Sequence, residues 1–185
     1  MAGALFPGLL GPAFDRLAPP LRRLHAGIVT IEVRGTVRVE RPGGVPGRLA
    51  GLLAGLPGAG DGLPIAIAFR PDGAGGEVWD RRIGRHRFRT RLSATPSGLL
   101  HERTALAGGV FAVTVDADGA LLLRPRGATL LGLPWPRAMG VTASAREWAG
   151  AAPAGTPAIR FTVEIALPLI GPVLRYDGHL AAPPE

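Results

Sequence analysis

The chain has 185 residues, a formal net charge of +7 and 46% hydrophobic residues, enough for a folded domain with a sizeable core. It contains no cysteine, which excludes disulfides, thiolate nucleophiles and cysteine-ligated metal or iron–sulfur sites. All 21 basic residues are arginine, so a Schiff-base lysine and a P-loop lysine are excluded as well.

Residues 1–26 are predicted to form a helical segment. Apolar residues recur there at spacings of three and four, and two prolines interrupt the stripe, so we expect two short helical pieces. The uncharged run 1–14 is shorter than the roughly 20 residues of a membrane span, so no transmembrane segment is expected. No basic residue precedes Arg16, which argues against a secretory signal and favours a cytoplasmic location.

Residues 28–40 alternate between apolar and polar side chains, as a long half-buried strand does. Gly35 falls on the apolar face, where a missing side chain permits a bend or a close approach. Residues 46–56 place four leucines on one face and predict a helix packed against the sheet. Short alternating runs separated by turn signals follow at 63–70, 76–83, 85–92, 98–104, 109–116, 120–126, 141–148, 157–166 and 172–180.

These elements predict an α+β fold that is predominantly β. About ten strands form a strongly curved antiparallel meander, a half-barrel or barrel, wrapped around one or two short helices. We expect a single domain over 1–185, with the helical segment 1–26, the sheet 27–181 carrying the inserted helix 46–56, and a tail 182–185.

The run 77–92 predicts a hairpin whose turn centres on Gly84 and residue 85. An arginine, Arg81, then lies on the apolar face, where an unpaired charge would be costly. Glu102 interrupts the apolar face of the next strand and is the expected partner. Two interpretations remain: the pair fixes the strand register while stacked on Trp79, or it lines a cavity and anchors the polar head of a ligand.

The opposite face of this hairpin is rich in arginine. A positive surface of this kind suits an anionic partner, such as an acidic protein or an anionic membrane surface. A solvated outer face is the alternative, with Asp80 beside Arg89. Aromatic residues are too few for a stacking platform, so specific nucleic-acid binding is not expected. The residues of this surface are Arg82, Arg87, Arg89 and Arg91.

A curved sheet of this kind readily leaves an apolar cavity, so the first functional hypothesis is a non-enzymatic module that binds a hydrophobic small molecule or lipid. Trp135, held between two prolines, is either a rigid plug at one end of the barrel or a lid over the cavity. Docking through the arginine face is the second hypothesis. The candidate cavity residues are Trp79, Arg81, Phe88, Glu102, Trp135, Phe161 and Tyr176.

An enzyme that uses Glu102 as acid or base is the third hypothesis. A cavity holding Glu102 beside His101 or Ser93 would support it, although strand parity points His101 away. The four histidines show no metal-ligand spacing, the serines lack a nucleophile elbow, and no dinucleotide-binding glycine motif opens a helix. No catalytic residue, metal site or cofactor is therefore assigned.

A series of motifs runs along the chain in a fixed order. Its residues are Trp79, Arg81, Ile83, Gly84, Phe88, Thr90, Glu102, the runs 131–136 and 165–171, Tyr176 and Gly178. This series resembles the bacterial family called domain of unknown function 4166. The resemblance spans nearly the whole chain and implies a shared fold without implying an activity. Relatives fused to oxidoreductase-like or membrane segments would suit an accessory or ligand-holding module.

Overall fold

The computed structural model describes residues 4–42, 44, 57–104, 107–130, 133–135, 142–167 and 171–184. Its eleven strands form one antiparallel sheet in the order β6-β5-β4-β3-β2-β1-β11-β10-β9-β7-β8. The strands are β1 (Ile31–Glu40), β2 (Gly60–Pro71), β3 (Glu77–Ile83), β4 (His86–Ala94), β5 (Leu100–Arg103), β6 (Ala107–Val115), β7 (Leu121–Leu130), β8 (Leu133–Trp135), β9 (Thr142–Ala151), β10 (Pro157–Leu167) and β11 (Gly171–Ala181).

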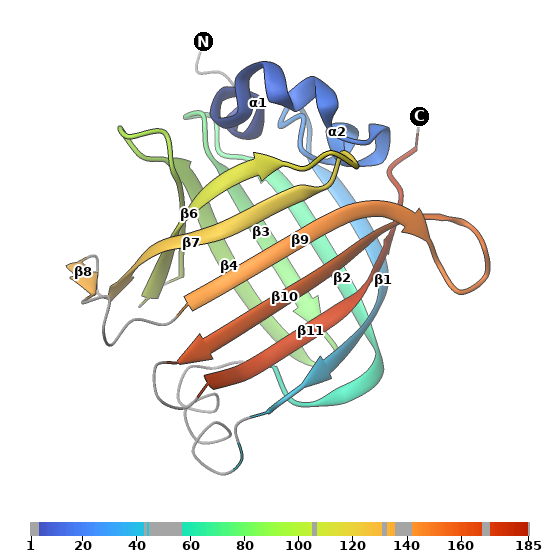
Figure 1. The fold of residues 1–185 in the computed structure, drawn as a ribbon. Coiled ribbons are helices and arrows are strands. Elements are labelled where there is room, and N and C mark those ends of the chain that lie inside the picture. The colour runs from blue at the N-terminus through green and yellow to red at the C-terminus, as the bar shows by residue number, and fades with distance from the viewer. Residues whose placement is uncertain are drawn as a thin grey trace.

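The sheet closes on itself because β6 also pairs with β7. Ten strands make the barrel, and β8 is an extra strand on the edge of β7. The predicted curved antiparallel fold is therefore confirmed, and it is a barrel rather than a half-barrel (Figure 1). Closure removes the exposed sheet edges that favour aggregation.

Short helical pieces lie across one end of the barrel (Figure 1). They are α1 (Leu5–Leu10), the 3₁₀ helix η1 (Gly11–Arg16) and α2 (Pro19–Leu24). The two prolines that were expected to interrupt a helix instead occupy the first turn of α2, where a missing N–H costs nothing. We call these pieces the helical cap. The predicted helix 46–56 lies outside the described residues.

No helix in the described part of the chain is long and apolar enough to span a membrane.

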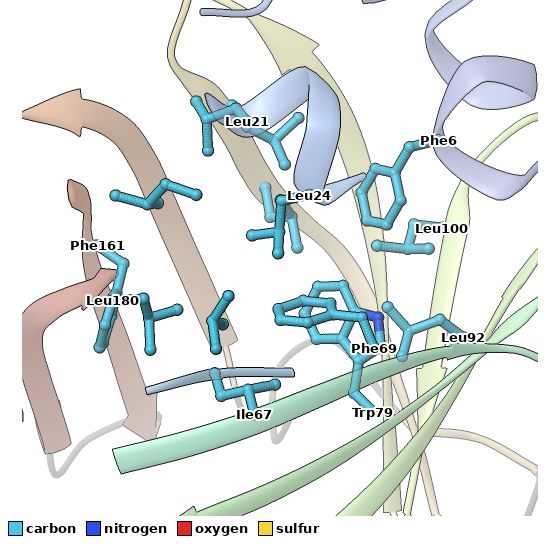
Figure 2. Close-up of a cluster of buried hydrophobic side chains, with 14 of the residues drawn as sticks. Phe6, Leu21, Leu24, Ile67, Phe69, Trp79, Leu92, Leu100, Phe161 and Leu180 are labelled. Atoms are coloured by element: carbon cyan, nitrogen blue, oxygen red, sulfur yellow. The ribbon is translucent and has the colours of Figure 1, made fainter. Parts of the chain in front are cut away.

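The buried core extends from the helical cap to the opposite end of the barrel, where Val39, Ile83 and Leu174 are buried. Phe6, Leu21 and Leu24 of the cap point down into the barrel toward Phe69 and Trp79 (Figure 2). Phe6 is completely buried and stacks on Trp79 with ring centroids 6.0 Å apart. The cap therefore supplies part of the core and is not an accessory on its surface.

Gly35 sits where β1 and β11 approach each other closely. A methyl group at this position would lie 1.8 Å from the carbonyl oxygen of His179, so any side chain must push the two strands apart. We expect Gly35→Ala to lower the free energy of unfolding by about 2 kcal/mol in urea titrations. Gly127→Ala is the control, because nothing lies within 4 Å of the added methyl group. Equal stability of the two variants would contradict the close packing.

Candidate functional site

The hairpin of β3 and β4 has the predicted register. Ile83 pairs with His86, Arg81 with Phe88 and Trp79 with Thr90. These residues therefore share the face that points into the barrel, as the alternation indicated. The inward position of Arg81 is confirmed, and its side chain is only 10% exposed.

Arg81 forms the predicted ion pair with Glu102 of β5. Its Nη1 lies 2.9 Å from Oε1 of Glu102, and the same nitrogen donates a 2.7 Å hydrogen bond to Oγ1 of Thr90. The guanidinium lies over the Trp79 ring at 4.6 Å and over the Phe88 ring at 5.5 Å. The group is thus held on a fixed aromatic platform inside the barrel.

Four polar atoms at and around this pair have no hydrogen-bond partner among the described residues. Both hydrogen bonds of Arg81 come from Nη1, so its Nε and Nη2 have no hydrogen-bond partner among the described residues. The same holds for the second carboxylate oxygen of Glu102 and for the hydroxyl of Tyr176. Unused donors and acceptors on a rigid support are what a binding site for a polar head requires.

Tyr176 of β11 faces the same space. Burial raises the pKa of its phenol to about 12, Arg81 opposes the rise, and Glu102 and Glu147 add to it. The charges of Arg81, Glu102 and Glu147 therefore each act on the Tyr176 phenol. The phenol stays protonated at neutral pH and is available as a hydrogen-bond donor.

Several side chains that point into the barrel remain partly exposed. Other inward-facing apolar side chains are buried, both near the cap, as Leu100 and Ile159 are, and at the opposite end, as Ile83 and Leu174 are. The partly exposed inward residues are Phe88, Glu102, Ala143, Ala145, Val163, Ile165 and Tyr176.

A pocket of about 410 Å³ opens at the end of the barrel away from the cap. Leu63 of β2 and Ile83 of β3 form its apolar wall, and Arg85 and His86 of the β3–β4 turn contribute polar groups. The size suits a small organic molecule. Its lining does not include Arg81, Glu102 or Tyr176.

The remaining cavity candidates have different surroundings. Trp79 and Phe161 are buried in the core, and Phe161 contacts Tyr176 edge to face. Trp135 ends β8, and its side chain lies outside the part of the chain that the structure describes. His101 and Ser93 were the two residues that could have stood beside Glu102. They pair with each other on the outer face of β4 and β5. They therefore do not stand beside the carboxylate.

Sequence reasoning did not identify a second polar cluster under the helical cap. His25, at the end of α2, is completely buried and its Nε2 lies 2.8 Å from a carboxylate oxygen of Glu147 on β9. Glu77 of β3 is also buried and accepts a hydrogen bond from Nε1 of Trp79. Glu77 is two residues from Trp79 on the same strand, so alternation places it on the inward face. The contact between residues 25 and 147 has no local signal in the sequence.

Among the described residues, no group of three or more acidic or histidine side chains is arranged to hold a metal ion.

Glu77 gives the protein a specific pH dependence. Desolvation by burial raises the pKa of this carboxyl group, so folding favours its protonated form. The contribution of Glu77 to native stability is therefore greatest below the ordinary carboxyl pKa and falls as the pH rises through the raised value. Glu77→Gln cannot ionise and keeps an acceptor for Trp79. In urea titrations we expect this variant to gain stability relative to wild type as the pH rises above about 4. A difference between the proteins that is independent of pH would contradict this.

The outer face of the same hairpin carries the predicted arginines. Arg82, Arg87, Arg89 and Arg91 are all exposed. Asp80 pairs with Arg89 as expected and also with Arg70, and the hydrogen bond from Arg89 holds the pKa of Asp80 below its usual value.

A comparison with known families completes this description. A family model described as a domain of unknown function (DUF4166) matches residues 17–180. The chain belongs to this family. The match to DUF4166 begins just before α2 and covers the barrel through β11. No curated protein matches the chain. The DUF4166 description assigns no activity, so function must be argued from the geometry.

Proposed function

We propose that this DUF4166 barrel binds a hydrophobic small molecule or lipid in the half of its interior away from the helical cap. The ion pair of Arg81 and Glu102 carries the proposal, because it holds unused polar atoms inside the barrel beside the aromatic rings of Trp79 and Phe88. In this proposal the ligand's apolar part contacts Phe88, Ala145 and their neighbours, and its polar part binds the pair.

The unfavourable free energy of burying an ion pair supports a binding role. An ion pair inside a barrel is seldom more stable than apolar residues of the same volume, so stability alone does not account for it. Two small side chains of β9, Ala143 and Ala145, also point into the barrel and are only partly buried. Such a combination of partly buried apolar side chains and fixed polar groups is typical of ligand sites.

Filling the space tests the proposal. N-phenyl-1-naphthylamine, an apolar dye that fluoresces when it leaves water, is titrated into wild type, Ala145→Phe and Ser144→Phe. Residue 145 points inward and residue 144 is exposed on the same strand, so the second variant is a matched control. We expect Ala145→Phe to weaken dye binding at least tenfold and Ser144→Phe to leave it unchanged. Equal binding by all three proteins would place the dye elsewhere and contradict the proposal.

A second candidate function is docking on an acidic protein or an anionic membrane through the arginine face. One observation favours it: Arg82 lies directly opposite Arg87, and Arg91 lies directly opposite Arg103. Like charges in such positions repel each other, and none of these four arginines forms an ion pair with a described residue. An anion placed between them would relieve the repulsion.

Vesicles test this candidate. Wild type should bind vesicles that contain phosphatidylserine at low salt and dissociate at high salt. Reversal of the charges at residues 82, 87, 89 and 91 should abolish binding. Vesicle binding that survives the charge reversal would contradict docking through the arginine face. If the wild type binds an acidic protein but no vesicles, the partner is an acidic protein and not a membrane.

A further inference from the structure

We infer that the interior site selects a ligand with an uncharged polar head, such as an alcohol or a carbonyl group, and rejects both carboxylates and amines. This inference rests on the proposed binding function and specifies its ligand class. It follows from the way charges are already matched inside the barrel.

Each charged group near the site already has a partner. Arg81 is paired with Glu102 at 2.9 Å, so the two opposite charges at the site balance each other. A fatty acid would bring a further negative charge next to the Glu102 carboxylate. An alkylamine would bring a positive charge to a guanidinium that lies between two aromatic rings. The charged head of either ligand would lose its hydration and would find no unpaired opposite charge in the site to bind.

A hydroxyl group, in contrast, matches the unused atoms. It can donate to the free carboxylate oxygen of Glu102, because a hydroxyl has one hydrogen to give. It can accept from the phenol of Tyr176 or from an unused N–H of Arg81. A carbonyl group has no hydrogen to donate, so it would only accept hydrogen bonds from the Tyr176 phenol or from the unused N–H groups of Arg81. The site therefore completes its hydrogen bonds with a neutral head and no change in net charge.

The test compares three ligands with equal apolar chains: decan-1-ol, decanoate and decylamine. Each displaces the naphthylamine dye from the wild-type protein at pH 7. We expect decan-1-ol to bind at least tenfold more tightly than either charged ligand. Tighter binding of decanoate or decylamine would overturn the inference while leaving the binding function intact. Absence of binding by the dye and all three ligands would refute the binding function itself.

A variant at residue 102 is expected to shift the preference from decan-1-ol toward decanoate. Glu102→Gln leaves Arg81 without its compensating charge, so decanoate should gain at least tenfold relative to decan-1-ol. Glu164→Gln, on the exposed outer face of β10, removes the same charge elsewhere and should leave the ratio unchanged. Tyr176→Phe removes one donor and should weaken decan-1-ol binding severalfold. An unchanged ratio in Glu102→Gln would contradict the inference, and the wild-type comparison decides it even if this variant fails to fold.

Discussion

Replacing Arg81 with methionine is expected to lower the free energy of unfolding by about 3 kcal/mol. The substitution keeps much of the side chain's volume but removes the partner of Glu102, whose side chain is only 21% exposed. It also leaves the hydroxyl of Thr90 without its donor. Urea titration monitored by circular dichroism measures the loss.

The neighbouring residue provides the control. Arg82→Met removes the same charge from the outer face of the same strand and should change stability by less than about 0.5 kcal/mol. The double variant Arg81→Met with Glu102→Leu should recover most of the loss, because no charge is then left unpaired. Similar effects of Arg81→Met and Arg82→Met would mean that the ion pair is not held inside the barrel.

Replacing Phe6 with alanine is expected to cost about 4 kcal/mol, since a large, completely buried ring leaves a cavity in the core. Phe6 lies 4.4 Å from the His25 ring and stacks on Trp79, so its removal also loosens the helical cap over the polar cluster beneath it. Urea titration measures the change. The tryptophan emission, to which Trp79 contributes together with two other tryptophans, should shift toward that of a more hydrated indole.

Leu9, on the same helix but only partly buried, is the comparison. Leu9→Ala should cost about 1 kcal/mol, because less of its surface leaves water on folding. If Phe6→Ala were no more harmful than Leu9→Ala, the cap would not belong to the core of the barrel.

The hairpin around Gly84 shows how much of the site the sequence could predict. Alternation has a period of two, so fixing the turn also fixes every facing pair along both strands. Arg81 and Glu102 stood out because each interrupts an apolar face with a charge, and buried charges require partners. Their pairing could therefore be predicted before the structure.

Other features had no such signal. Alternation reports the face of a residue and not the neighbouring strand, so barrel closure through β6 and β7 and the pairing of β7 with β9 could not be derived. The contact of His25 with Glu147 joins residues 122 positions apart and depends on both of those features. The position of the cap over one end of the barrel likewise depends on closure (Figure 1).

Native mass spectrometry of gently purified protein tests the binding function most directly. The intact mass is compared with that of the chain, and any released molecule is extracted into solvent and identified. The binding function predicts a stoichiometric apolar passenger that Ala145→Phe loses and Ser144→Phe retains. A clean mass of the chain alone, together with no uptake of the naphthylamine dye, would contradict it and leave the arginine face as the functional surface.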